Sequence, residues 1–233
     1  MSTTTLPSAP PAGRRRRLRT LTALAAVLLL AAVAAVLWWR PWRTVTLPAH
    51  ACWGVLTAGD LRPLAGADGT MTAATNTSTL QPATQATNGG YLCPLSWQGG
   101  QAPHYLGGGP KIALYTAAEL RRARAADASR GAVRSLSLGP GNIAWQASGD
   151  YSLSLAVPCT FRDPFSGQSA DGYARVSIDA TPSPRGYPAP PGEVRQADAQ
   201  IVLKLAKAFV EQYPCTAARL PASTPSIPAY PGS

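Results

Sequence analysis

The sequence predicts an α+β fold in which one N-terminal transmembrane helix precedes an extracytoplasmic antiparallel sheet. The sheet packs with a C-terminal amphipathic helix and is held by disulfides. Three patterns predict this class: an apolar segment without charge from Leu21 to Trp39, alternation of apolar and polar residues over 151–159 and 173–180, and large apolar residues at every fourth position from Ile201 to Tyr213. Alternation has the period of a strand, and the last pattern has the period of a helix.

The apolar segment predicts an uncleaved signal-anchor, a transmembrane helix over residues 20–39. Leucine, valine and alanine supply nearly all of this segment. At about 1.5 Å per helical residue, the uncharged stretch spans about 28 Å, close to the bilayer core of about 30 Å. We therefore expect a single pass through the cell membrane.

The flanking residues predict the orientation of this helix. Positively charged flanks stay in the cytoplasm, so residues 1–19 are expected to form a basic cytoplasmic tail and the rest of the chain an outer domain. The cytoplasmic side holds Arg14, Arg15, Arg16, Arg17 and Arg19, whereas the outer side holds only Arg40 and Arg43. Three tryptophans are expected at the outer headgroup level, where amphipathic rings are favoured: Trp38, Trp39 and Trp42.

A cleaved signal peptide is the alternative interpretation. Ala32-Val33-Ala34 has the small-x-small pattern that a signal peptidase accepts. However, apolar sequence continues from Ala35 through Trp39, beyond the point where a cleaved segment turns polar. We favour the anchor, and a released product that begins near Ala35 would contradict it.

The charge distribution argues against a nucleic-acid partner. The formal net charge of +10 comes from 21 basic and 11 acidic residues. Seven of the basic residues flank the apolar segment, which leaves 14 basic against 11 acidic residues from residue 44 onward. This balance is ordinary, so the basic pI reflects topology rather than a DNA-binding surface. The expected partners are the lipid bilayer and an envelope protein or cell-wall component.

Four cysteines on the side predicted to be outside indicate two disulfides. They are Cys52, Cys93, Cys159 and Cys215. Three pairings are possible, and proximity favours Cys52 with Cys93 and Cys159 with Cys215, each worth about 4 kcal/mol on the chain-entropy model. No Cys-x-x-Cys and no cysteine–histidine pair with zinc spacing occurs, so we expect no metal and no cofactor.

One extracytoplasmic domain is expected over residues 51–215, after a juxtamembrane linker over 40–50. Within it, residues 69–90 are rich in Thr, Asn, Gln and Ala and predict a long exposed loop. Residues 216–233 are rich in proline and predict a disordered tail.

The first half of this domain is expected to contain two capped helices. Thr57 with Asp60, and Thr116 with Glu119, have the spacing of capping boxes. The first predicts a short helix with inward leucines, Leu61 and Leu64, and the second a helix through about Ala128. Two strands are expected over 91–97 and 111–115, the former with four residues on one buried face: Tyr91, Cys93, Leu95 and Trp97.

In the second half, short strands are expected over 133–138 and 143–147, followed by the antiparallel pair over 151–159 and 173–180. The last element is expected to be a helix capped by Asp198, with one apolar face and with Lys204 and Lys207 on the other side.

Candidates for catalysis are few. His104 lies in a Gly-rich stretch, and Asp163 and Asp171 share a predicted loop. A nucleophile needs a base within hydrogen-bond reach; there is no Gly-x-Ser-x-Gly motif, and the cysteines are assigned to disulfides. We therefore name no catalytic, cofactor-binding or metal-binding residue.

A cluster of arginines offers a binding candidate. Arg121, Arg122 and Arg124 lie on the predicted helix and could contact an anionic partner such as a wall polymer or a lipid headgroup. A solvated helix face is the simpler interpretation of this cluster.

The motif pieces together resemble a known group of proteins. They are the arginine cluster with its anchor, Cys52-Trp53-Gly54 with Leu56, Asp60, Leu61 and Leu64, Leu92-Cys93-x-Leu95-x-Trp97, a strand that ends in Cys159, and Tyr213-Pro214-Cys215. This combination, over most of residues 14–215, resembles actinobacterial, Streptomyces-type, single-pass membrane-anchored extracytoplasmic proteins with four cysteines. The resemblance implies the topology and the two bridges, and it implies no catalytic residue.

We therefore expect a single-pass cell-envelope protein whose outer domain is a non-catalytic binding or interaction module. The alternative is an extracytoplasmic hydrolase or transferase that acts on an envelope substrate through His104, Asp163 or Asp171.

Overall fold

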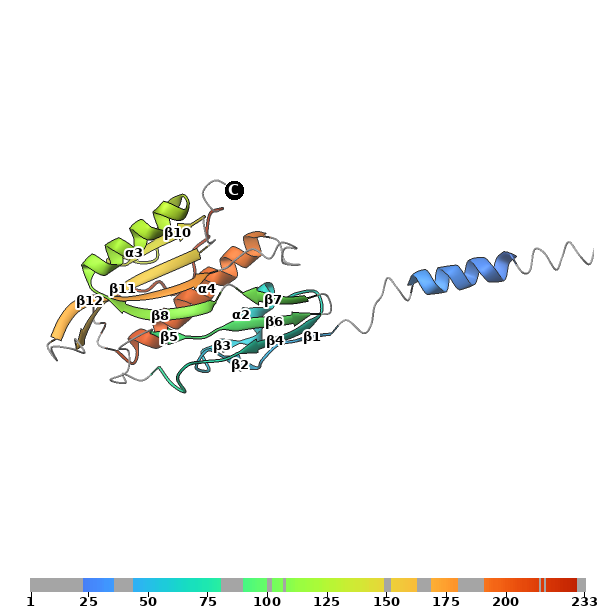
Figure 1. Ribbon diagram of the computed structural model, residues 1–233, viewed down its shortest axis with the longest axis horizontal. Coiled ribbons are helices and arrows are strands. Elements are labelled where there is room, and N and C mark those ends of the chain that lie inside the picture. Colours follow the sequence, from blue (N-terminus) through green and yellow to red (C-terminus); the bar gives the residue numbers. More distant parts are fainter. Residues whose placement is uncertain are drawn as a thin grey trace, which may run out of the picture. The chain divides into compact units, whose positions relative to one another are not determined.

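The computed structural model describes residues 23–35, 44–80, 90–99, 102–106, 108–148, 152–162, 169–179, 191–213, 215 and 217–229. The chain divides into two compact units, Met1–Thr44 and Val45–Ser233. The second unit holds the sheets and both disulfides (Figure 1).

Apart from Thr44, the described part of the first unit is a helix over residues 23–35. Its large apolar side chains are exposed on every side, with Leu24, Leu28 and Leu30 all above 60% exposure. Within the described ranges, no helix has both the length and the apolar character needed to cross a membrane. The ends of the predicted span and its flanking arginines and tryptophans lie outside the described residues, so the transmembrane helix stays a prediction.

The second unit has the α+β fold that the sequence predicts. Its larger sheet is antiparallel, in the order β5 (Tyr91–Leu92), β8 (Gly109–Tyr115), β12 (Ser169–Asp179), β11 (Ser152–Arg162), β10 (Ile143–Ala147) and β9 (Val133–Leu136). The smaller sheet has the order β1 (Val45–Thr46), β4 (Gly69–Ala73), β6 (Leu95–Gly99) and β7 (Ala102–Leu106), with β1 parallel to β4. A separate hairpin pairs β2 (His50–Ala51) with β3 (Leu56–Thr57).

The predicted antiparallel strand pair forms the centre of the larger sheet. β11 and β12 pair along their full lengths, from Ser152 opposite Asp179 to Arg162 opposite Ser169. Leu153, Leu155 and Val157 join the main core, while Ser152, Ser154 and Ala156 alternate with them and face the opposite side. The alternation in the sequence therefore separates an apolar face from a mixed polar face.

α4 (Pro191–Val210) covers the apolar face of this sheet. The predicted cap at Asp198 is wrong, because the helix begins at Pro191, a residue whose φ suits the first turn, and Asp198 is fully buried inside it. The single apolar face is also wrong: on its side away from the sheet, α4 contacts β3, α2 (Ala58–Leu61) and η1 (Arg62–Leu64). The helix is thus central to the unit and is buried on most of its circumference.

α3 (Ala117–Arg130) packs on the other face of the larger sheet, against β8 and β12. Leu120 joins a second small core with Trp145, Ala147 and Ala156. Both predicted capping boxes are confirmed, at Thr57 with Asp60 and at Thr116 with Glu119.

Two predicted segments of the first half differ in the structure. Residues 91–97 form two strands in different sheets, because the chain leaves β5 at Cys93-Pro94 and enters β6 at Leu95. The predicted loop over 69–90 contains β4, which pairs with β6 and buries Met71 against the core. In addition, β1 begins inside the predicted linker over 40–50.

The proline-rich segment after Cys215 is ordered over residues 217–229, contrary to the predicted disorder. Ile227 is buried in the main core, and Gln196 of α4 donates to Pro225 O and accepts from Ile227 N. Gln146 of β10 donates to Pro228 O. Side-chain amides thus provide hydrogen bonds to the backbone of this segment. Its prolines also lower the conformational entropy that the segment loses when it becomes ordered.

The two disulfides join Cys52 to Cys93 and Cys159 to Cys215. Both pairings confirm the prediction from proximity. The first ties the β2–β3 hairpin to the crossing between the two sheets, and the second ties the end of α4 to β11.

Candidate functional site

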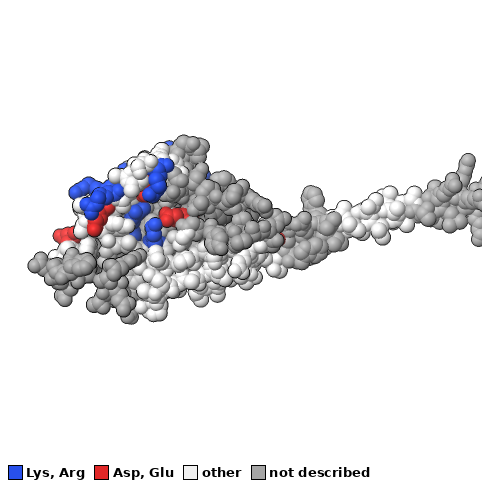
Figure 2. Space-filling view, in the orientation of Figure 1, with Lys and Arg blue, Asp and Glu red and all other residues white. Residues whose placement is uncertain are grey.

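The strongest candidate surface is the outer side of α3 together with the neighbouring strand β9. These two elements contain five arginines and only two acidic residues. Arg121, Arg122, Arg130 and Arg134 are exposed, and we name these four residues the α3 basic face. Figure 2 shows Lys and Arg side chains, with some Asp and Glu side chains among them, gathered over this end of the unit, whereas most other described atoms in the view belong to uncharged residues.

A capping box determines where α3 begins. Thr116 Oγ1 accepts a hydrogen bond from Glu119 N, and the Glu119 carboxylate accepts one from Thr116 N at 2.8 Å. These hydrogen bonds from Thr116 lower the pKa of Glu119, and the positive charge of Arg122 adds to the effect. Glu119 therefore stays ionised and is committed to the helix terminus.

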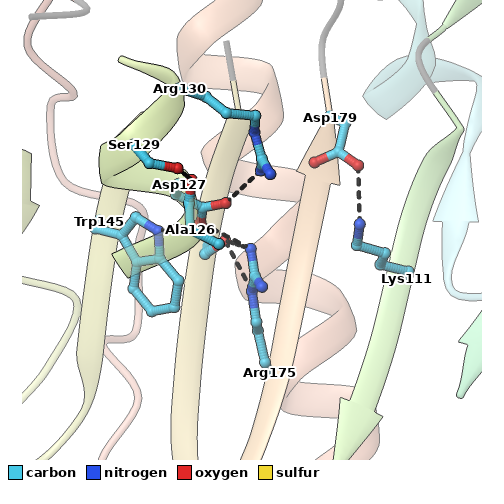
Figure 3. A network of polar contacts seen from close by, with 9 residues as sticks. Lys111, Ala126, Asp127, Ser129, Arg130, Trp145, Arg175 and Asp179 are labelled. Carbon is cyan, nitrogen blue, oxygen red and sulfur yellow. Dashed lines mark hydrogen bonds and ion pairs between the residues drawn. The ribbon is translucent and has the colours of Figure 1, made fainter. Parts of the chain in front are cut away.

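A buried ionic network holds the other end of α3 on the sheet (Figure 3). Asp127 Oδ2 accepts hydrogen bonds from Trp145 Nε1 at 2.8 Å and from Arg175 Nη2 at 3.1 Å. Its Oδ1 accepts one from Arg130 Nη2 at 2.6 Å. Because Asp127 and Leu120 are the buried residues of α3, these contacts carry much of the attachment of the helix.

The guanidinium of Arg175 is itself enclosed by the sheet. It donates to Ser154 Oγ through Nε at 3.1 Å and Nη2 at 2.9 Å. It also lies 4.9 Å from the centre of the Trp145 ring, within the range of a cation–π interaction. Such a satisfied buried pair is costly to break from one side, so the network fixes the position of α3.

This arrangement leaves Arg121 and Arg122 of the α3 basic face exposed. Arg130 donates a hydrogen bond to Asp127, yet its side chain is still 50% exposed to solvent. Arg134 donates to Ala229 O, and Arg124, beside the face, donates to Ser135 Oγ at 2.7 Å. The described contacts therefore hold the helix and its flanks and involve neither Arg121 nor Arg122.

Next to the network lies a second polar patch on the same sheet face. Lys111 of β8 pairs with Asp179 of β12 at 2.9 Å. Ser152 and Ser177 lie beside them in the strand register and are buried, and within the described residues neither hydroxyl has a hydrogen-bond partner. The polar face of the sheet thus continues beyond α3.

A pocket of about 380 Å³ opens near the start of α3. It is lined by Ala117, Pro158, Cys159, Thr160, Asp171, Gly172, Tyr173 and Ala217. Inside it, Thr160 Oγ1 donates to Asp171 Oδ1 at 3.0 Å. This carboxylate is exposed, and the other described polar side chains that line the pocket, Thr160 and Tyr173, carry hydroxyl groups.

The sequence candidates for catalysis are only partly described. Asp171 lies in β12 rather than in a loop. Asp163 lies outside the described residues, and of His104 the structure places only the backbone, in β7 of the smaller sheet. Among described residues, no group of three His, Cys, Asp or Glu side chains has the arrangement of a metal site.

Two further carboxyls are buried around α4. Asp60 accepts hydrogen bonds from Lys204 Nζ and from Thr57 N and Oγ1. Burial raises the pKa of Asp60, but these hydrogen bonds and the nearby ammonium outweigh burial and lower it overall. Asp60 is therefore an ionised link between α2 and α4.

Asp198 has the opposite environment. Neither of its carboxyl oxygens has a hydrogen-bond partner within the described part of the chain. Burial raises the pKa of Asp198 well above its ordinary value, so the neutral acid is the favoured form. Its full enclosure in the core keeps it from any substrate at the surface.

Sequence reasoning found Arg121, Arg122 and Arg124 of α3. It missed Arg130 and Arg134, and it missed the residues that position the helix. Asp127 and Arg175 are far apart in the chain, and their contact is visible only once α3 lies on β12. A usable signal was present: Arg175 is a charged residue in the centre of a strand whose other face is apolar, and such a residue needs a partner.

No protein-family model matches the chain. No curated protein has a significant match to it, and no solved structure does. The fold and the site define the class of protein: an α+β domain with two disulfides that displays an arginine-bearing helix. Its role has to be argued from these residues.

Proposed function

We propose that this chain is a single-pass cell-envelope protein whose outer domain is a non-catalytic binding module. The observation that carries the proposal is the use of the buried charges. Asp60, Asp127 and Arg175 form ion pairs within the fold. On the surface of α3 and β9, by contrast, the arginines of the α3 basic face outnumber the exposed carboxylates. A fold that holds one charged helix rigidly is suited to recognition.

The membrane anchor is part of the same proposal. The helix over 23–35 exposes leucine and valine on all sides, and contiguous exposed apolar surface marks a membrane or protein contact. The five arginines before it and the two disulfides after it favour an N-terminus in the cytoplasm and a domain outside the cell. The resemblance to actinobacterial membrane-anchored proteins supports the same arrangement.

An extracytoplasmic hydrolase or transferase is the second candidate. The pocket that holds Thr160 and Asp171 favours it, since a carboxylate in a concave site is a possible general base. If Asp171, Asp163 and His104 carried an activity, replacing all three by Asn or Ala would abolish complementation of a deletion strain. Full complementation by the triple variant would leave the binding role.

Capture of the partner in cells tests the binding role directly. Photoreactive amino acids in place of exposed residues of the outer domain should crosslink to one specific envelope component. Carbonate washing of membranes should leave the chain in the pellet if the anchor is uncleaved. Capture of nothing specific from any exposed element would count against the proposed function.

A further inference from the structure

We propose that the α3 basic face binds a linear anionic polymer with repeated phosphate groups. This inference rests on the proposed function and names the chemistry of its partner. Arg121 and Arg122 are exposed, they take part in no described ion pair, and Arg130 and Arg134 lie on the same end of the unit. Their charge is balanced on these elements only by Glu119 and Asp127, and Asp127 is buried.

The kind of side chain favours phosphate. A guanidinium donates two parallel hydrogen bonds to one oxyanion and keeps its charge at every physiological pH. A tetrahedral phosphate offers oxygens to more than one guanidinium at once, and clusters of arginine are the recurrent means of binding such groups. Small neighbours on the exposed surface of α3, including Ala118, Ala125 and Ser129, leave room for a chain to lie close to the helix.

The position of α3 favours a polymer over the headgroups of the anchoring bilayer. The chain enters the domain at β1, in the smaller sheet, and Figure 1 shows β1 and α3 well apart within this unit. α4 and the larger sheet lie between α3 and the elements α2 and η1 that follow β1 in the chain. The strands β1, β4, β6 and β7 contain no Asp, Glu, Lys or Arg. The strands of this smaller sheet are therefore uncharged, and the α3 basic face lies across the larger sheet from α2 and η1.

The attachment of α3 suits such a role. A helix with so little buried apolar surface is not held by packing alone. Asp127 joins it to Trp145 and Arg175 of the sheet, so its arginines are presented in a fixed arrangement. Preorganised cations lose less entropy on binding than mobile ones.

The test uses the full chain in nanodiscs of phosphatidylcholine, with inorganic polyphosphate as the probe. We expect saturable binding that weakens steeply with salt. The pair Arg121→Gln and Arg122→Gln should weaken binding about tenfold or more and make the salt dependence shallower. Arg121→Lys with Arg122→Lys should restore part of the affinity, because the charge returns without the bidentate geometry.

The matched control is Arg62→Gln with Lys207→Gln, which removes the same charge from η1 and α4. This control should change the affinity for polyphosphate by less than about twofold. Equal affinity of the α3 pair and the wild type, or absence of polyphosphate binding, would overturn the inference. Pelleting with phosphatidylglycerol vesicles that depends on Arg121 and Arg122 and exceeds polyphosphate binding would also overturn it, with a bilayer as the occupant.

Crosslinking in cells separates this inference from the proposed function. A photoreactive amino acid in place of Ala125 reports on α3, and one in place of Thr70 reports on the exposed face of the smaller sheet. A phosphate-containing adduct from Ala125 supports the inference. Specific capture from Thr70 alone overturns the inference and keeps the binding role. Absence of capture from these two positions and from every other exposed element overturns both.

Discussion

Lys204 of α4 lies 2.5 Å from Asp60 Oδ1 at the end of α2, and the carboxylate side chain is only 3% exposed. This contact joins the first helical element of the domain to its central helix. Gln200 Nε2 lies 3.3 Å from the same oxygen. The pair thus organises the side of α4 that faces away from the larger sheet.

Asp60→Asn should therefore destabilise the protein by about 2–3 kcal/mol at neutral pH, since it removes charged hydrogen bonds at a buried position. The folded-state pKa of Asp60 is lowered, so its contribution is fully present above the unfolded pKa of about 3.9 and is lost as pH falls through the folded pKa. Urea unfolding of the wild type and the variant should therefore converge only as pH falls below the lowered folded-state pKa of Asp60. The more exposed ion pair between Lys111 and Asp179 provides the control, because Asp179→Asn should lower the free energy of unfolding by less than about 1 kcal/mol.

Local signals in the sequence were sufficient for the parts of the fold that depend on neighbours in the chain. The alternation over 151–159 and 173–180 predicted β11 and β12, and both capping boxes predicted the starts of α2 and α3. Proximity predicted both disulfides. The alternation and the capping boxes lie within the elements that they determine, whereas the paired cysteines are 41 and 56 residues apart and were paired only by their order in the chain.

The remaining features depend on tertiary partners that no local pattern reveals. The tail over 217–229 is ordered because Gln146 and Gln196 bind its carbonyl groups, and because Gly139 has no Cβ where Arg219 O approaches it. The environment of Asp198 depends on which elements cover both sides of α4. In the same way, the position of the α3 basic face depends on a contact between Asp127 and Arg175, which are 48 residues apart.

Asp198→Asn should stabilise the protein at neutral pH. Because burial raises the folded-state pKa, the native state keeps a proton that the unfolded state loses above about pH 4, and stability falls as pH rises through this window. The gain should be near zero at pH 3 and grow by about 1.4 kcal/mol for each pH unit until the folded pKa is reached. Thermal unfolding across pH measures it.

Glu211→Gln, a change of an exposed carboxyl just after α4, should leave the pH profile within about 0.5 kcal/mol of the wild type. A gain for Asp198→Asn that is the same at pH 3 and pH 7 would show that the pKa of this carboxyl is equal in the native and unfolded states, which would contradict the prediction.

Asp127→Ala should loosen α3 before the rest of the domain. It leaves the Arg175 guanidinium buried without its carboxylate, which costs about 3–5 kcal/mol. Hydrogen exchange should show faster exchange of the α3 amides than in the wild type, with β11 and β12 less affected. Arg124→Gln removes only the exposed bond to Ser135 and should leave exchange of α3 almost unchanged. Equal loss of protection in α3 and β11 would mean that the network supports the whole sheet rather than the helix.

Gln196→Ala should release the C-terminal segment while leaving the sheets folded. Gln196 binds this segment with both ends of its amide, through Pro225 O at 3.0 Å and Ile227 N at 3.2 Å, and each lost bond costs about 1 kcal/mol. Limited proteolysis should then cleave within 217–229 faster than in the wild type. The exposed neighbour on the same helix provides the control: Glu193→Gln should not change the rate. Since proteolysis of a locally opened segment follows its opening free energy, a loss of about 2 kcal/mol corresponds to roughly thirtyfold faster cleavage. An unchanged rate would mean that burial of Ile227, and not the amide of Gln196, holds the segment in place.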